Sequence, residues 1–157
     1  MKISALEEYG LRCLVQLARE GADPGGGTML SARQIAEREG LSLEYTSQIL
    51  ATLRRAGLVA SQRGVHGGFR LARPADEITV GELFRSCDGP IAAGICDSYT
   101  GKRDTCMHES DCNVAPIWRE LARRIYGFLD GIRIADIANG TVDTGPAVVP
   151  LSTLRPR

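Results

Sequence analysis

The order of apolar and polar residues in the first third of the chain predicts helices with defined starts and stops. Ser4 and Glu7 have the spacing of a capping box, which begins a helix. The apolar face of this helix carries Leu6, Cys13, Leu14 and Leu17. A second capping box, Ser31 with Gln34, begins a short helix that ends at Gly40. The chain therefore opens with two amphipathic helices.

A third helix follows after a tight turn. Ser42 is placed to cap its first turn, and Gly57 ends it. Its inward positions are Ile49, Leu50 and Leu53. Two helices joined by a short glycine-containing turn are typical of a helix-turn-helix. The start of the second helix of such a motif meets base edges in the major groove of DNA.

The stretch from Leu58 to Ala72, LVASQRGVHGGFRLA, predicts two short strands joined by a glycine-rich turn. Residues 58–60 open the first strand of this prediction, and residues 69–72 form the second. The turn contains Gly64, Gly67 and Gly68, which adopt positive φ at little cost. A small hairpin directly after a helix-turn-helix is the wing of a winged helix. The predicted fold class is therefore mostly α with a small β-hairpin wing.

The second half of the chain predicts a further helical region after a cysteine-containing segment. Thr79 and Glu82 form a third capping box, and Pro116 suits the first turn of a long helix. That helix repeats apolar residues at spacings of three and four, namely Trp118, Leu121, Ile125, Phe128 and Ile132. The seam packs either on its own domain or on the same helix of a second subunit. We favour a homodimer, because winged helices commonly read two DNA half-sites.

Charge is distributed unevenly in this chain of 157 residues, whose net charge is +0. The segment from Tyr45 to Ala75 contains no Asp or Glu, and it carries Arg54, Arg55, Arg63, Arg70 and Arg73. Such a segment is either a solvated arginine face or an electrostatic footprint for phosphate. On the second interpretation the partner is double-stranded promoter DNA. The predicted DNA-binding residues are Ser42, Tyr45, Ser47, Gln48, Arg54, Arg55, Arg63, His66 and Arg70.

Three cysteines, Cys96, Cys106 and Cys112, form a C-x9-C-x5-C pattern in a polar segment without helical or strand period. The spacing differs from the close pairs of zinc fingers, whereas three thiolates suit an iron–sulfur cluster. A cluster needs a fourth ligand, for which His108, Asp111 and Glu8 are the candidates. The alternative is three unligated surface thiols. We interpret the remaining two cysteines, Cys13 and Cys87, as core residues.

Taken together, these motifs resemble the iron–sulfur-cluster winged-helix regulators of the IscR and NsrR type. The likeness covers Met1 to about Gly140. It is carried by MKIS…EYGLRCL, LSLEYTSQILATLRRAGLV, RGVHGGFRLAR, EITVGELFRSCDGP and the triple-cysteine segment. The resemblance implies a homodimeric transcription regulator, a repressor, whose promoter affinity depends on a [2Fe-2S] or [4Fe-4S] cluster. The cluster would report redox, nitric oxide or iron–sulfur status.

The resemblance also implies ligands. Cys96, Cys106 and Cys112 match the three thiolate positions, although the first gap is longer than is usual in these regulators. Where IscR-type members have a histidine ligand this chain has Ala115. NsrR-type members take an acidic ligand near the N-terminus of the partner subunit, which Glu8 matches. We therefore expect Glu8 as the fourth ligand, with His108 as second choice.

The expected organisation follows from these assignments. It consists of a DNA-binding domain (1–90), a cluster-binding loop (91–113), a dimerisation helix region (114–140) and a disordered tail (141–157). The chain has no apolar run of membrane-spanning length, so we expect a cytoplasmic protein without membrane contact.

Three other classes of protein are compatible with parts of the pattern. One is a cluster-free regulator that senses a small metabolite or cysteine oxidation. Another is a winged helix that binds proteins rather than DNA. The third, an enzyme or electron carrier, is the least favoured, because the sequence has no nucleophile–base constellation and no phosphate-binding glycine loop before a helix. We therefore expect neither an enzyme nor a small-molecule substrate.

Overall fold

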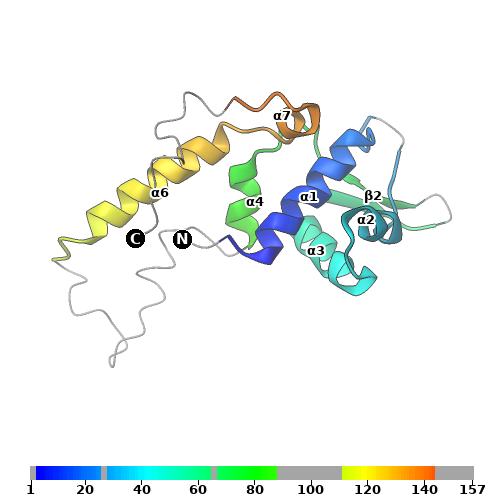
Figure 1. Ribbon diagram of the computed structural model, residues 1–157, viewed down its shortest axis with the longest axis horizontal. Helices are drawn as coiled ribbons and strands as arrows, with labels where there is room; N and C mark the ends of the chain where they lie inside the picture. The colour runs from blue at the N-terminus through cyan, green and yellow to red at the C-terminus, as the bar shows by residue number, and fades with distance from the viewer. Residues whose placement is uncertain (1–2, 26–27, 65–66, 88–110, 144–157) are drawn as a thin grey trace, which may run out of the picture.

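The computed structural model describes residues 3–25, 28–64, 67–87 and 111–143. This part of the chain is mostly helical with one antiparallel hairpin, which confirms the predicted fold class. Figure 1 shows a helical body from which one long helix extends. The helices and strands are α1 (Ala5–Arg19), α2 (Ala32–Glu39), α3 (Leu43–Arg55), β1 (Val59–Gln62), β2 (Gly68–Leu71), α4 (Val80–Cys87), α6 (Ala115–Asp130) and α7 (Ile134–Asn139).

Side chains just before the first three helices satisfy backbone amides that have no partner within the helix. Ser4 Oγ accepts a hydrogen bond from Glu7 N at 3.2 Å, and the Glu7 carboxylate accepts one from Ser4 N at 2.6 Å. Ser31 and Gln34 form the same reciprocal pair before α2. Ser42 caps α3. The predicted caps are confirmed, and each is worth about 1 kcal/mol.

Glycines turn the chain at both ends of α3. Gly40 ends α2 in the left-handed region, with φ of 65°. A hydrogen bond of 2.9 Å from Leu41 N to Ala36 O closes the turn that leads into α3. Gly57, with φ of 72°, reverses the chain after α3 and leads it into β1. Helices α2 and α3 therefore form the predicted helix-turn-helix, with the hairpin directly after it.

The first strand of the hairpin begins within the stretch that the sequence predicts to open it. Strand β1 runs to Gln62, which pairs with Gly68, and Val59 pairs with Leu71. The run of consecutive apolar residues ends at Ala60, so the exposed end of β1 carries no hydrophobic signal. Residues 65–66 of the turn, including His66, lie outside the described residues.

The segment before α2 joins the hairpin as a third backbone partner. Leu30 and Phe69 exchange hydrogen bonds, with Leu30 N to Phe69 O at 3.0 Å and Phe69 N to Leu30 O at 2.8 Å. The neighbouring Gly68 has no room for a side chain, because a Cβ there would lie 2.7 Å from Leu30 O. The base of the wing is thereby fixed to the helical body.

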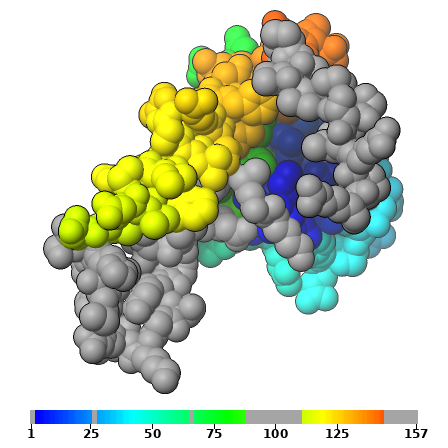
Figure 2. Space-filling model, turned by 60° about the vertical axis from the view of Figure 1, so that its left-hand side comes forward, coloured from blue at the N-terminus to red at the C-terminus, as the bar shows by residue number. Residues whose placement is uncertain are grey.

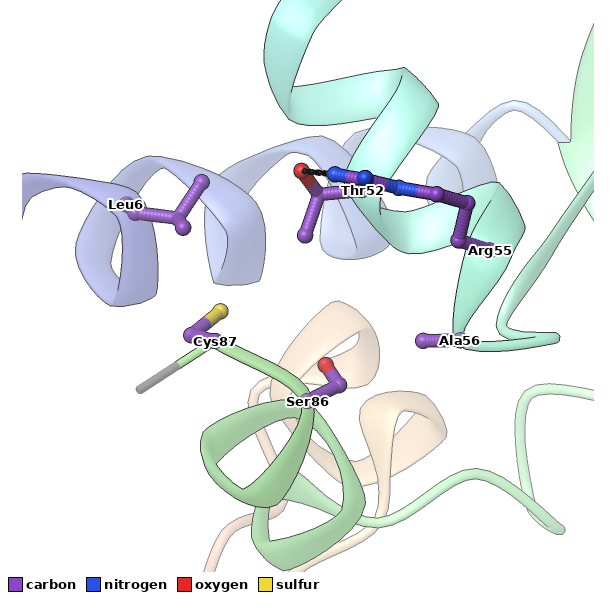
Figure 3. A pocket seen from close by; sticks show the side chains of 6 residues that line it. All are labelled: Leu6, Thr52, Arg55, Ala56, Ser86 and Cys87. Atoms are coloured by element: carbon purple, nitrogen blue, oxygen red, sulfur yellow. Dashed lines mark hydrogen bonds between the residues drawn. The ribbon is translucent and has the colours of Figure 1, made fainter. Parts of the chain in front are cut away.

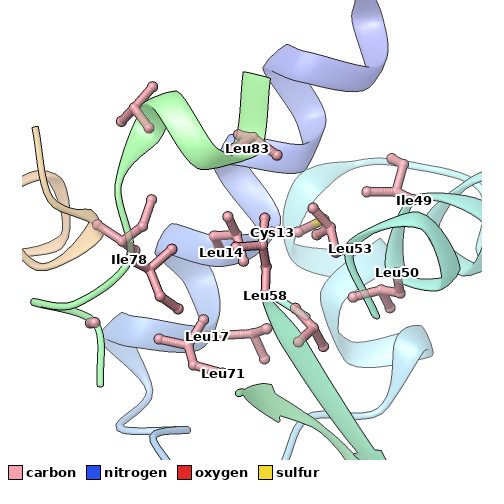
Figure 4. Close-up of a cluster of buried hydrophobic side chains, with 14 of the residues drawn as sticks. Cys13, Leu14, Leu17, Ile49, Leu50, Leu53, Leu58, Leu71, Ile78 and Leu83 are labelled. Atoms are coloured by element: carbon pink, nitrogen blue, oxygen red, sulfur yellow. The ribbon is translucent and has the colours of Figure 1, made fainter. Parts of the chain in front are cut away.

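Helix α1 lies at the centre of the hydrophobic core (Figure 4). Side chains from α3, the hairpin and α4 surround it. The largest fully buried side chains are Leu14, Leu17, Ile35, Ile49, Leu50, Leu53, Leu58, Leu71, Ile78, Leu83, Ile134 and Val59. Burying one such side chain contributes about 1.5–3 kcal/mol. The core therefore holds α3 and the hairpin in a fixed relation to α1.

Helices α6 and α7 return the chain to the body. Val80 N donates to Ile132 O at 3.0 Å, and Ile134 N donates to Ile78 O at 3.0 Å, so α7 is tied to the segment before α4. The other end of α6 points away from α1 (Figure 1). Figure 2 shows α6 as an arm that projects from the body.

Several sequence predictions fall outside the part of the chain that the structure describes. Residues 88–110 contain Cys96, Cys106 and His108, and residues 144–157 contain most of the tail. The predicted ligands and tail in these ranges stay predictions. Among the described residues, no helix combines the length and the hydrophobicity that crossing a membrane requires.

Candidate nucleic-acid interface and cysteine residues

The start of α3 presents polar side chains to solvent. Ser42, Ser47 and Gln48 are exposed, and Leu43 beside them is 46% exposed. Ser42 Oγ is used as the helix cap, and Ser47 Oγ donates to Leu43 O at 2.7 Å. Of these polar side chains, Gln48 is the one with a length and an amide group suited to a bidentate contact with adenine.

Tyr45 is less exposed than Ser42, Ser47 and Gln48. It is half-buried, and its ring meets Tyr9 of α1 edge to face, with centroids 6.1 Å apart and an interplanar angle of 85°. The Arg12 guanidinium lies over the ring of Tyr9, 6.0 Å from its centroid. An aromatic neighbour on α1 therefore contacts the ring of Tyr45.

Arg54 and Arg55 lie in the last turn of α3 and are both exposed, but their side chains make different contacts. Arg54 Nη1 donates to Ser61 Oγ on β1 at 3.2 Å, which joins the helix to the wing. Arg55 Nη2 donates to Thr52 Oγ1 at 3.1 Å along its own helix. Neither guanidinium forms an ion pair with a carboxylate of the described residues, so both can meet an external anion.

The two arginines of the wing, Arg63 and Arg70, differ in exposure and in the contacts of their side chains. Arg63 follows β1 and is exposed beside Gly64, whose φ of 116° turns the chain. Arg70 is half-buried, and its Nη1 donates to Pro24 O at 3.3 Å. Arg70 therefore anchors the wing to the segment after α1, whereas Arg63 is the arginine nearest the tip.

Two of the predicted cluster ligands are described. Cys112 is half-buried just before α6, where its Sγ accepts a hydrogen bond from Ala115 N at 3.3 Å. Glu8 is exposed in the first turn of α1 and forms an ion pair of 2.8 Å with Arg12. The described residues contain no group of three or more His, Cys, Asp or Glu side chains that could hold a metal ion. The other two thiolates, Cys96 and Cys106, lie outside the described residues.

The two cysteines interpreted as core residues differ from each other. Cys13 is fully buried, and burial raises the pKa of its thiol to about 12, so it is an unreactive core residue. Cys87 at the end of α4 is half-buried and lines a cavity of about 470 Å³ (Figure 3). Cys87 packs against the hydrophobic core, as the sequence predicts, and it also borders this cavity.

The geometry defines the class of protein. An exposed helix start, an arginine-bearing wing and a core that fixes both to α1 together make a winged helix-turn-helix of the kind found in transcription regulators. Residues 3–140 match the Rrf2 family, described as "Iron-dependent Transcriptional regulator". The chain belongs to the Rrf2 family of transcription regulators.

Relatives and solved structures agree with this assignment. The chain is 36% identical over 140 residues to the HTH-type transcriptional regulator IscR of Aliivibrio salmonicida, covering 87% of this chain and 77% of the relative. It is 33% identical to IscR of Cereibacter sphaeroides, covering 96% of each chain. Both relatives are named as transcription regulators.

Two solved structures share the fold over most of their length. The structure of T. potens IscR is similar with a TM-score of 0.67 and 31% identity, covering 94% of this chain and 93% of that one. CymR, described as the global cysteine regulator of B. subtilis, is similar with a TM-score of 0.68 and 30% identity, covering 90% and 99%.

Proposed function

We propose that this protein is a homodimeric repressor whose affinity for promoter DNA is controlled by an iron–sulfur cluster. The observation that carries the proposal is that one hydrophobic core holds both α3 and the wing. The family to which the chain belongs is described as iron-dependent, which supports the cluster. The signal would be redox, nitric oxide or iron–sulfur status, and the protein would act in the cytoplasm.

On the DNA side, the residues divide into base contacts and phosphate contacts. Gln48 and Ser47 at the exposed start of α3 are the candidates for base edges, with Tyr45 beside them. Arg54 and Arg55 at the end of α3 are the candidates for phosphate, which positions the protein without specifying sequence. His66 and Arg70 complete the proposed contacts of the wing.

Arg63 has a separate role in this proposal. Its exposed position after β1 suits entry into a narrow minor groove, where A·T tracts concentrate negative potential. An arginine inserted there reads the width of the groove rather than base edges.

A second copy of this chain is the partner that suits the outer face of α6. Val114, directly before the helix, is 49% exposed, and on the helix Ile117 is 61%, Leu121 43% and Phe128 51% exposed. These four side chains share one face by helical spacing, whereas Ala122 and Tyr126 are buried on the other side. Pairing of two such faces would set the separation between two winged helices.

The donor set that the family resemblance implies fits an iron–sulfur cluster. The hydrogen bond from Ala115 N to Cys112 Sγ holds in place the sulfur that would bind iron. Glu8 offers an exposed carboxylate on a different element from Cys112, which suits donation from the partner subunit. Cys96, Cys106, Cys112 and Glu8 would hold the cluster, which when bound supplies a redox-active and exchangeable link between the subunits.

Spectroscopy of oxygen-free protein tests the ligand set. Iron and sulfide assays with visible and electron-resonance spectra should show a cluster in the wild type and none in C96S/C106S/C112S. Glu8→Ala should change the spectrum. Arg12→Ala breaks the Glu8 ion pair while keeping the carboxylate, and it should leave the spectrum unchanged. An unaltered spectrum in Glu8→Ala would exclude Glu8 as the fourth ligand.

A cluster-free regulator that senses a small metabolite or cysteine oxidation is the second candidate. The similarity to CymR, described as a cysteine regulator, is the observation that favours it. Colourless oxygen-free protein without bound iron, which still binds DNA, would support this candidate over the first.

A further inference from the structure

A cavity of about 470 Å³ opens where α1 begins and where α3 and α4 end. Its volume lies within the range of small-molecule sites in proteins, roughly 300–1,000 Å³. The residues that line it are Leu6, Thr52, Arg55, Ala56, Ser86 and Cys87. Figure 3 shows the sulfur of Cys87 directed into the space between Leu6 and Thr52.

The lining combines one positive charge with hydroxyl groups and apolar surface. The Arg55 guanidinium donates one hydrogen bond, to Thr52 Oγ1, and it keeps further N–H groups for another acceptor. Ser86 Oγ donates to Leu83 O at 2.7 Å, so its oxygen can still accept. No acidic side chain is among the described residues that line the cavity. This surface is complementary to a small anion.

We propose that this cavity binds a small organic carboxylate. Arg55 holds the carboxylate through paired N–H···O bonds, which its planar fork favours. Leu6 contacts the apolar part of the ligand, and Cys87 lies beside it. None of the described residues that line the cavity is a proposed cluster ligand or a proposed base contact.

Binding at this site competes with DNA for the same guanidinium. Arg55 follows Gln48 by seven residues, which is about two turns, so both lie on one face of α3. A carboxylate that engages Arg55 withdraws it from phosphate and lowers DNA affinity, and DNA lowers the affinity for the carboxylate equally. The competition between carboxylate and DNA rests on the proposed DNA binding, whereas the anion site itself does not.

Cys87 provides a reporter for the site in full-length C96S/C106S/C112S. The cysteines left are Cys87 and the buried, high-pKa Cys13. The probe is 5,5′-dithiobis(2-nitrobenzoate), a disulfide that carries carboxylates, and 2,2′-dithiodipyridine is its neutral counterpart. In either reaction the Cys87 thiol gives its proton to solvent and its sulfur attacks the reagent disulfide. One new S–S bond forms, the reagent S–S bond breaks, and one thiolate leaves with the electron pair.

The ratio of the two reaction rates measures the preference for an anion. Arg55→Gln is expected to lower the ratio of the carboxylate reagent to the neutral reagent about 10-fold, because it removes the local positive charge. Arg54→Gln removes an equal charge one residue away, where the side chain contacts Ser61, and should leave the ratio within about twofold of the parent. Equal effects of the two substitutions would overturn the anion site.

A second readout tests the competition with DNA. Binding of a fluorescent duplex is measured at fixed salt before and after Cys87 is converted to the thionitrobenzoate adduct, and again after reduction. The adduct is expected to bind DNA about 10-fold more weakly, with recovery on reduction. Unchanged DNA binding by the adduct would overturn the competition. If neither form binds DNA while the rate ratio still depends on Arg55, the anion site stands and the proposed function fails.

Discussion

The guanidinium of Arg85 on α4 and the carboxylate of Asp130 at the end of α6 form a two-point ion pair. Arg85 Nη1 lies 2.8 Å from Asp130 Oδ1, and Nη2 lies 2.6 Å from Oδ2. The same guanidinium lies 4.3 Å from the centroid of the Tyr126 ring. This Arg85–Asp130 clamp joins the helical body to the arm that carries the proposed dimer face.

Removing the charge of Asp130 is expected to weaken the clamp. Both side chains are 42% exposed, so Asp130→Asn should lower the free energy of unfolding by only about 1 kcal/mol at pH 7. Urea unfolding of the wild type and the variant measures this difference. A difference within error of zero at pH 7 would show that the clamp contributes nothing to stability.

The pH dependence of that difference gives an independent check. The hydrogen bond from Arg85 lowers the pKa of Asp130 below its ordinary value. A carboxylate with a lowered folded pKa adds stability above its unfolded pKa of about 3.9, and this stability is lost as the pH falls through the folded pKa. The difference in stability between the wild type and Asp130→Asn should therefore begin to shrink below about pH 4 and disappear below the folded pKa of Asp130. A constant difference down to pH 3 would contradict this assignment.

Gly81 leaves the space that the clamp needs. A Cβ at Gly81 would clash with Asp130 Oδ1, so Gly81→Ala should displace the carboxylate from Arg85. We expect Gly81→Ala to destabilise the wild type by about 1 kcal/mol. In the Asp130→Ala background it should be neutral or stabilising, because alanine favours helix over glycine by up to about 1 kcal/mol. A thermodynamic cycle without coupling between the two positions would refute the proposed contact.

The exposed face of α6 is expected to hold the dimer together. Leu121→Glu places a charge in the middle of that face, and burying it unpaired costs several kcal/mol. Light scattering after gel filtration should therefore report a monomer for this variant. Arg119→Glu serves as control, because residue 119 lies about 160° around the helix from Leu121. The proposed interface fails if Leu121→Glu and Arg119→Glu have the same mass as the wild type.

Arg63 is expected to contribute strongly to specific DNA binding. Arg63→Ala should weaken binding to an operator duplex at fixed salt about 10-fold, because a minor-groove contact is lost. Arg123→Ala is the matched control, since Arg123 lies on α6 and pairs with Glu120 at 2.7 Å. Fluorescence anisotropy measures both. Equal affinities of Arg63→Ala and Arg123→Ala would exclude this role for Arg63.

Local signals in the sequence were sufficient for the helices of the DNA-binding part. Helix starts could be predicted from Ser4, Ser31 and Ser42, because an N-cap depends only on the residues that follow it within one turn. Gly40 and Gly57 mark the stops for the same local reason. The core of α1 and α3 followed from helical periodicity alone.

Contacts between distant segments could not be predicted in this way. No pattern of neighbouring residues indicates that Tyr45 contacts Tyr9 or that Arg70 donates to Pro24. The same holds for the cavity that Cys87 lines at the end of α4. Each depends on how α1, α3 and α4 pack, which periodicity does not specify. The apolar seam predicted for α6 and the residues after it does not lie on a single surface. Leu121 and Phe128 are exposed, whereas Ile132 packs against the core of its own subunit.

The most direct test of the central claim is the DNA affinity of two forms of the protein under oxygen-free conditions. Fluorescence anisotropy with one promoter duplex at one salt concentration compares the wild type as purified with C96S/C106S/C112S. Control of DNA binding by the cluster predicts dissociation constants that differ at least about 10-fold, in either direction. Equal dissociation constants, with iron bound in the wild type and absent from the variant, would contradict the claim.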